Sequence, residues 1–208
     1  MLKTNGWREQ HYSVLWNFLM HLNRHSNKYV LKGGTALMMC YNLTRFSEDI
    51  DLNGYSRDIE NIVSTFCIQN RITYTVKKDT DTVKKYMINY GGTKAVKVEV
   101  SYRLKSIDVE AETCRINGIL VYNIQNILMM KLQAYMGRDK IRDLYDVVFI
   151  GLNYWELLNQ QLIYMMKTTL AYRGLEQFDF VIKDQEDELI NNEELEEGFL
   201  SLWYKLKL

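Results

Sequence analysis

The sequence predicts an α+β fold in which a strand-rich half ends near residue 122 and a helical half follows it. Up to that point, short runs alternate apolar and polar residues with the period of two that is typical of half-buried strands. From Asn123 onward, apolar residues recur every three or four positions, as they do in amphipathic helices. We therefore expect two domains, residues 1–122 and residues 123–208.

The strand-rich half is predicted to open with an amphipathic helix over Trp7–Leu22. Tyr29–Leu31 is a short apolar strand, Lys32–Thr35 a tight turn, and Ala36–Tyr41 a helix that starts directly after the turn. The remaining elements expected in this half are a strand at Asp49–Leu52, a helix at Ile59–Cys67, strands at Ile72–Val76, Val83–Tyr90 and Ala95–Tyr102, and an edge strand at Ile116–Val121.

The helical half is predicted to begin with Asn123 as the N-cap of a helix that ends at Gly137. A second helix is expected from Asp139 to Ile150, stopped by Gly151. Two more helices are expected, at Tyr154–Leu170 and Gln185–Trp203.

The composition is that of a globular protein outside the membrane. The chain has 208 residues, of which 47% are hydrophobic, so it can bury a substantial core. No apolar run approaches the ~20 residues that span a bilayer, and the N-terminus lacks the apolar core of a signal peptide. The three cysteines are far apart, which indicates neither a disulfide framework nor a zinc knuckle. We expect a cytoplasmic protein with no membrane partner.

Charge is balanced overall but segregated along the chain. The 26 basic and 26 acidic residues cancel, yet the segment from Arg71 to Lys105 carries nine basic and three acidic residues. Strands of this composition could attract a phosphate backbone, with Lys84 and Lys85 as two of the contacts, or could simply be a solvated face. Between Asp184 and Glu197 there are eight acidic residues and no basic one, which predicts a face that repels nucleic acid or is merely solvated.

The turn formed by Gly33, Gly34 and Thr35 is a candidate phosphate site. A helix that starts directly after a strand and a glycine turn points unpaired backbone amides at an anion, and its dipole favours negative charge. Glycine lets the backbone approach closely, and the Thr35 hydroxyl could donate to a phosphate oxygen. A glycine pair on its own is more often only a turn.

Two carboxylates strengthen this interpretation. Asp49 and Asp51 alternate with apolar residues, so both project from one face of a strand. They repel each other there unless a cation lies between them. Mg²⁺, or Mn²⁺, is the natural candidate, because hard cations bind one or two carboxylates together with substrate phosphates. The alternative is a solvent-facing strand edge on which the aspartates only keep the protein soluble.

A third carboxylate is available on the strand that contains Lys97 and Glu99. The valines of this strand face one way, and Lys97, Glu99 and Ser101 face the other. Glu99 could complete the metal site, and three carboxylates could hold two metal ions. A pair between Glu99 and a lysine on a neighbouring strand is the alternative.

Two stretches together resemble the AbiEii family of nucleotidyltransferase-like toxins, which belongs to the polymerase-beta-like superfamily. The first runs from Leu31 to Leu37 and continues at Arg45–Leu52, with the glycine turn, Arg45, Ser47 and the Asp pair in order. The second comprises Lys131–Ala134, Arg138 and Arg142–Asp146. The region after Tyr154 matches only as generic helices. The resemblance implies a polymerase-beta-like nucleotidyltransferase domain with a mixed sheet, followed by a helical bundle.

The resemblance also implies roles for individual residues. Gly33, Gly34 and Thr35 are expected to bind the triphosphate of a nucleotide, with Arg45 and Ser47 beside them. Asp49 and Asp51 are expected to hold the metal ion. In the helical half, Lys131 is expected to contact a phosphate, and Asp146 to be an essential polar contact or base near the acceptor. The alternatives are that Asp143 is the essential aspartate, that either aspartate only forms salt bridges with Arg138 or Arg142, and that Arg45 pairs with Asp49.

The implied activity is transfer of a nucleoside monophosphate from a nucleoside triphosphate to an acceptor hydroxyl. By resemblance the acceptor is RNA, the 3′ end of a transfer RNA, and the protein is the toxin of a toxin–antitoxin pair with a cognate antitoxin. Lys131 lies in the second half of the chain, so we expect the site to lie in a cleft between the halves. Two alternatives stay open. One is an enzyme that modifies a protein hydroxyl, and the other is a catalytically silent domain that binds a nucleotide or a partner protein.

Overall fold

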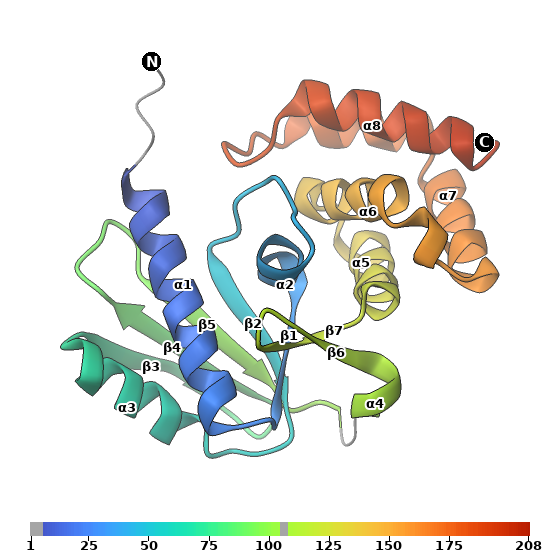
Figure 1. The fold of residues 1–208 in the computed structure, drawn as a ribbon. Coiled ribbons are helices and arrows are strands. Elements are labelled where there is room, and N and C mark those ends of the chain that lie inside the picture. Colours follow the sequence, from blue (N-terminus) through green and yellow to red (C-terminus); the bar gives the residue numbers. More distant parts are fainter. Residues whose placement is uncertain (1–5, 105–107) are drawn as a thin grey trace. The chain divides into compact units, whose positions relative to one another are not determined.

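A seven-stranded mixed sheet forms the centre of the first unit of the chain (Figure 1). The computed structural model describes residues 6–104 and 108–208, so Lys105 lies outside the described residues. The strands are β1 (Tyr29–Lys32), β2 (Asp49–Gly54), β3 (Thr73–Asp79), β4 (Val83–Asn89), β5 (Val96–Ser101), β6 (Thr113–Ile116) and β7 (Ile119–Tyr122). Their order across the sheet is β3-β4-β5-β2-β1-β7-β6. The pairs β2/β5 and β1/β7 are parallel, and the other neighbouring pairs are antiparallel.

The two faces of this sheet differ because its central strands alternate apolar and polar residues. On one face Ile50 and Leu52 of β2 and Val98 of β5 are fully buried. On the other face Asp51 of β2 lies in register with Glu99 of β5. The sheet therefore has one apolar face, which packs in the core, and one polar face, which carries the charged residues predicted for the site.

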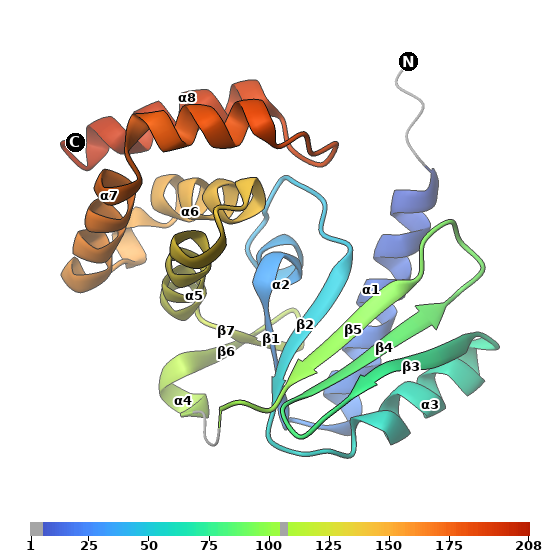
Figure 2. The same ribbon diagram turned by 180° about the vertical axis from the view of Figure 1, so that it is seen from behind.

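Helices α1 (Gly6–His25) and α3 (Ile59–Asn70) cover the apolar face. They pack against each other through Phe18 and Phe66, whose ring centroids lie 5.2 Å apart. In Figure 2, β3, β4 and β5 lie in front of both helices, so the opposite face of these strands is turned toward the viewer. The first unit also contains α2 (Gly33–Cys40), which follows β1 without a break, and the short α4 (Val109–Glu112).

The second unit, which begins at Asn123, is entirely helical. Its elements are α5 (Ile124–Arg138), α6 (Ile141–Asn153), the 3-10 turn η1 (Trp155–Leu157), α7 (Gln160–Asp184) and α8 (Asn192–Lys205). Asn123, Asn159 and Asn191 are N-caps whose side chains accept backbone amide hydrogens. Of the described helices, none combines the length and the apolar character needed to span a bilayer.

Several predicted elements differ from the structure. The expected edge strand over 116–121 is the hairpin β6–β7, and β7 lies inside the sheet beside β1. Asn117 and Gly118 both have positive φ, 52° and 83°, as the two central residues of a type I′ hairpin turn do. Helix α2 begins at Gly33 instead of Ala36, because the glycines form its first turn.

Glycines also explain the differences in the helical unit. Gly151 does not stop α6, which continues to Asn153. A Cβ at Gly151 would lie 2.8 Å from Leu202 Cδ1, so close helix packing requires this glycine. Helix α7 continues to Asp184 across a kink at Gly174, whose φ of 71° is not helical. The last helix starts at Asn192 instead of Gln185.

Candidate active site

The N-terminus of α2 lies beside the carboxylate-bearing strand β2. Gly33 has a φ of 76°, in the region that favours glycine, and a Cβ there would lie 3.0 Å from Asp51 Oδ2. The N-cap residue Lys32 makes no side-chain capping hydrogen bond. The positive end of the α2 dipole therefore lies next to the Asp51 carboxylate. Gly33 has no side chain that would fill the space between them.

Three side chains fix the loop between α2 and β2 close to these glycines. A Cβ at Gly34 would lie 2.8 Å from Arg45 Nη2 and 2.9 Å from Ser47 Oγ. The Thr35 hydroxyl lies 2.9 Å from Ser47 Oγ and is also in contact with the carbonyl oxygen of Asp49. Arg45, Ser47 and Thr35 are all buried. The structure thus brings these residues together, but it assigns the Thr35 hydroxyl to tethering β2 instead of leaving it available to a phosphate.

Asp49 and Asp51 project from the same face of β2, and a lysine lies against them. Lys97, which is in register with Asp49 on the parallel neighbour β5, places its Nζ 2.6 Å from Asp49 Oδ2. Burial would lower the pKa of Lys97, but the hydrogen bond and charge of Asp49 outweigh it and hold this pKa above its usual value. The sequence showed Lys97 on the polar side of its strand, but its partner depends on strand register, which the sequence did not predict.

The surroundings of Asp51 disfavour its negative charge. Burial is the main reason that the pKa of the Asp51 carboxyl lies above its usual range. Asp49 and Glu99 raise this pKa further, while Lys97 and Lys32 oppose the rise. A partly desolvated carboxylate next to two others is the arrangement that a bound cation relieves.

Glu99 lies in register with Asp51, but its carboxylate points to another partner. Lys85 on β4 places its Nζ 2.9 Å from Glu99 Oε2. Across residues 6–104 and 108–208, no three His, Cys, Asp or Glu side chains are grouped closely enough to hold a metal ion. The structure favours the lysine pair over the third metal ligand. Asp49 and Asp51 still fit a cation that takes one or two carboxylates and completes its shell with substrate phosphates and water.

Lys32 is a further charged residue of this site that the sequence did not single out. It pairs in register with Asp51, and its Nζ donates to Asn53 Oδ1 at 2.8 Å. Asn53 in turn donates to the Tyr122 hydroxyl at 2.9 Å, so the network reaches β7. Burial lowers the pKa of Lys32, and the neighbouring Asp51 and Glu99 carboxylates oppose this shift. Its position before the glycine turn was the only available signal.

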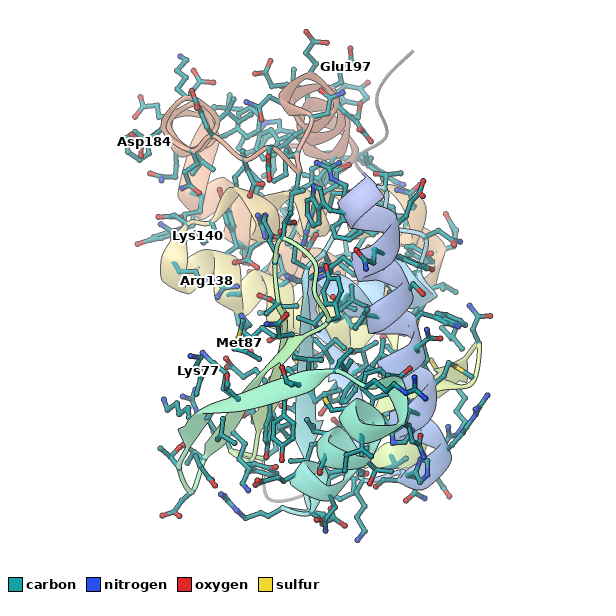
Figure 3. All side chains as sticks on the ribbon, turned by 90° about the vertical axis from the view of Figure 1, so that its left-hand side faces the viewer. Lys77, Met87, Arg138, Lys140, Asp184 and Glu197 are labelled. Carbon is teal, nitrogen blue, oxygen red and sulfur yellow. The ribbon has the colours of Figure 1, made fainter. Side chains whose placement is uncertain are left out.

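The described lysines of the basic segment, Arg71 to Lys105, differ in exposure and in their partners. Lys84 is buried on the apolar face, where its ammonium lies 3.2 Å from Asp79 and 3.5 Å from Glu60. The expectation that Lys84 contacts a phosphate backbone is therefore wrong, because this side chain is buried and paired with carboxylates. A register shift in β3 between Val76 and Lys78 pairs Lys78 with Lys85 on the polar face. Lys77 at this shift is exposed on the edge strand (Figure 3).

In the helical unit, Lys131 is buried between two carboxylates. Its Nζ lies 2.6 Å from Asp146 Oδ2 and 3.1 Å from Asp143 Oδ1. Asp143 also accepts two hydrogen bonds from Arg138, at 2.7 and 3.0 Å. The structure thus assigns the expected salt bridge with Arg138 to Asp143. Arg142 pairs instead with Asp187, a member of the acidic run whose ends, Asp184 and Glu197, are labelled in Figure 3.

The pKa of the Asp143 carboxyl lies below its usual range. Burial alone would raise it, but the hydrogen bond from Arg138 and the charges of Lys131 and Arg138 outweigh burial. Asp143 therefore acts as an ionised anchor for two cations. The carboxylates of Asp143 and Asp146 lie against the buried Lys131 ammonium and offset the cost of its burial.

A family model and two solved structures are similar to most of this chain. A family model described as nucleotidyl transferase AbiEii toxin, type IV TA system, matches residues 17–202. No curated protein sequence matches the chain. The crystal structure of JHP933 from Helicobacter pylori is similar with a TM-score of 0.80 and 28% identity, over 96% of this chain and 91% of that chain. A second H. pylori protein, described as a candidate nucleotidyltransferase, gives a TM-score of 0.78 and 26% identity, over 95% and 93%.

These similarities extend over nearly the whole of each chain and include both the sheet and the helices, so the predicted fold class is confirmed. The family match spans the glycine turn, the aspartate pair and the Lys131 cluster, and it makes the chain a nucleotidyltransferase. The chain belongs to the AbiEii family of nucleotidyl transferase toxins of type IV toxin–antitoxin systems.

Proposed function

We propose that this protein transfers a nucleoside monophosphate from a nucleoside triphosphate to the 3′ hydroxyl of a transfer RNA, and that this transfer is its toxic activity. A cognate antitoxin is the expected partner. One observation carries the proposal. The two glycines at the start of α2 lie directly against Asp51 of β2 and against Arg45 and Ser47 of the connecting loop.

The triphosphate is proposed to bind at the N-terminus of α2. The amides of the first helical turn have no partners within the helix, and the side chain of the N-cap residue Lys32 does not cap them. The Arg45 guanidinium next to Gly34 adds a fixed positive charge with planar donors that suit phosphate oxygens. A side chain at either glycine would occupy the space in which a phosphate approaches the backbone.

Asp49 and Asp51 are proposed to hold a divalent cation, Mg²⁺ or Mn²⁺, between themselves and the phosphates. When bound, this ion neutralises phosphate charge and favours attack by the acceptor hydroxyl. A cation at this place would compete with Lys97, whose Nζ lies 2.6 Å from Asp49 Oδ2, for the Asp49 carboxylate. With two carboxylates instead of three, the chain itself supplies ligands for one ion.

The chemistry is an exchange at the α-phosphorus. The acceptor oxygen forms a bond to it, the bond to the bridging oxygen of the β-phosphate breaks, pyrophosphate leaves, and the hydroxyl proton passes to a base or to water. We propose that Lys131 contacts a phosphate and that Asp146, 2.6 Å from its Nζ, keeps the ammonium in place. Lys131→Met is expected to lose transfer.

The acceptor surface is proposed to include the exposed lysines of β3. Lys77 and Lys78 are exposed at the register shift, whereas Lys84 is buried and Lys85 and Lys97 are paired with carboxylates. Contacts of this kind release counterions, so RNA binding should weaken with salt. Lys77→Ala and Lys78→Ala should each reduce the salt slope by about one.

The proposal is tested by incubating the protein and Mg²⁺ with each α-labelled triphosphate and total cellular RNA and protein. Labelled RNA that is one or more nucleotides longer supports it. Label in protein would support the rival enzyme that modifies a protein hydroxyl. No label in either fraction, with triphosphate bound, would support the catalytically silent domain. Asp51→Asn serves as the negative control, since it retains the shape of the site without the carboxylate.

A further inference from the structure

His11 on α1 is fully buried, although its ring is polar. It lies among three aromatic rings, with centroid distances of 5.9 Å to Trp7, 6.0 Å to Phe46 and 5.6 Å to Tyr90. A buried imidazole must satisfy both of its nitrogens or lose free energy. The partners of the two His11 ring nitrogens therefore indicate which parts of the chain this residue holds together.

Both ring nitrogens of His11 have partners that are distant in sequence. Nε2 lies 2.8 Å from the carbonyl oxygen of Glu48, and Nδ1 lies 2.9 Å from the Tyr90 hydroxyl. A carbonyl oxygen can only accept, so Nε2 carries the ring proton and donates it to Glu48. The Tyr90 hydroxyl can pair with Nδ1 as either donor or acceptor. These two contacts link His11 on α1 to the loop before β2 and to the residue that follows β4.

The Glu48 carbonyl is part of the loop that leads into the candidate site. The segment between α2 and β2 has no helix or strand of its own, and it carries Arg45 and Ser47 beside Gly34. Glu48 directly precedes Asp49, whose carbonyl oxygen accepts from Thr35. His11 thus holds one side of the Glu48–Asp49 step and Thr35 holds the other.

We propose that His11 is a positioning residue, which sets the Arg45–Asp49 loop so that Arg45, Ser47 and Asp49 meet at the start of α2. It acts through the backbone of Glu48, to which its ring donates a hydrogen bond. The inference rests on the proposed function for the meaning of that loop, but the hydrogen bonds that carry it do not depend on the reaction.

The test compares two amides of different length at position 11. In His11→Gln the carboxamide nitrogen lies close to the place of Nε2 and can still donate to Glu48. In His11→Asn the side chain is one methylene shorter, so it reaches the place of Nδ1 and not the Glu48 carbonyl. His25→Asn is the matched control, because His25 is an exposed residue of the same helix whose ring nitrogen lies 2.8 Å from the backbone oxygen of His21.

Hydrogen–deuterium exchange measures the position of the loop directly. His11→Asn should speed exchange in peptides that cover residues 42–49 and leave those from β4 and β5 unchanged, whereas His11→Gln and His25→Asn should match the wild type. The inference is overturned if the Gln and Asn variants behave alike. It is also overturned if exchange rises throughout the first unit, since His11 would then be an ordinary core residue.

Kinetics supply the second measurement. Loss of one positioning hydrogen bond should raise the KM for the metal–triphosphate by about tenfold in His11→Asn, with a smaller loss in kcat, and His11→Gln should restore KM. An unchanged KM in an active His11→Asn protein would contradict the inference. If the wild type transfers no nucleotide but exchange still separates Gln from Asn, the role of His11 stands and the proposed function fails.

Discussion

Asp51 occupies a position that disfavours an ionised carboxylate unless a ligand binds there. Its carboxylate is half-buried, Asp49 lies two residues away on the same face, and Glu99 lies in register on β5. Each neighbour raises the free energy of the ionised form. The charges of Lys97 and Lys32 offset only part of this unfavourable free energy. The ionised Asp51 therefore lowers the stability of the folded protein, as is common for residues that bind a ligand.

Asp51→Asn should therefore abolish nucleotide transfer without harming the fold. The amide keeps the shape of the side chain and removes the unfavourable charge, so the free energy of unfolding should be unchanged or higher by about 1 kcal/mol. Urea unfolding and a transfer assay on the same preparation measure both quantities. An Asp51→Asn protein with full activity would exclude the carboxylate as a metal ligand.

Asp143 should make the stability of the helical unit depend on pH in the acid range. Its pKa is lowered in the folded protein by Arg138 and Lys131, from an ordinary value of 3.8. A carboxyl with a depressed folded pKa contributes stability above its unfolded pKa and loses that contribution as the pH falls through the folded value. Unfolding curves from pH 5 to pH 2 should show this loss in the wild type and a smaller one in Asp143→Asn. Parallel curves for the two proteins would contradict the assigned anchor role.

At the scale of single elements, α2 and β2 are where the sequence was most informative. The alternation around Asp49 and Asp51 predicted a strand with both carboxylates on one face, and the structure has that strand. The glycine pair predicted a helix N-terminus, although the helix starts three residues earlier than expected. Both predictions depended on local patterns, which the chain displays directly.

Features that depend on long-range pairing could not be predicted in the same way. Lys97 meets Asp49 only through strand register, and His11 meets Glu48 across 37 residues. The prediction of a single strand over 116–121 is wrong, although the hairpin has a local signal, the Asn117–Gly118 pair that favours a two-residue turn. The prediction that Gly151 ends a helix is wrong, because the glycine serves a close contact with Leu202 on α8 that has no sequence signature.

Gly34→Ala tests the proposed role of the first turn of α2. The added methyl group would lie 2.8 Å from Arg45 and 2.9 Å from Ser47, so both side chains must move. The methyl group would also occupy part of the space proposed for a phosphate at the start of α2. We expect transfer to fall by roughly 100-fold or more, a loss of about 3 kcal/mol in transition-state stabilisation. Single-turnover kinetics at saturating triphosphate measure this fall.

Gly137→Ala is the control for that variant. It is also a helical glycine, in α5, and nothing lies within 4 Å of the Cβ it would gain. Alanine there should leave transfer unchanged and stabilise the helix by about 0.5–1 kcal/mol. Equal activity losses in the two variants would show that the effect at Gly34 is not specific to the site.

At the scale of the whole molecule, ligand binding should stabilise the native state. A triphosphate with Mg²⁺ that binds only the folded protein must raise Tm, by an amount that grows with its concentration. A diphosphate should raise Tm less, and EDTA should remove most of the shift. Differential scanning calorimetry of the wild type and Asp51→Asn measures this, and the variant should show no Mg²⁺-dependent shift. If no triphosphate changes Tm in the wild type, nucleotide binding at this site is excluded.

The position of β7 has a consequence for how the protein is made. β1, which leads into Gly33, pairs with β2 on one side and with β7 on the other, and β7 ends only at Tyr122. During synthesis β1 leaves the ribosome early, yet one of its edges stays open until the last strand of the sheet has followed. A nascent or prematurely ended chain that stops before Ile119 lacks that closure, and we expect it to be inert. Toxicity would then begin only after the whole sheet has been translated. Truncated messenger RNAs that end before Ile119 would yield inactive fragments.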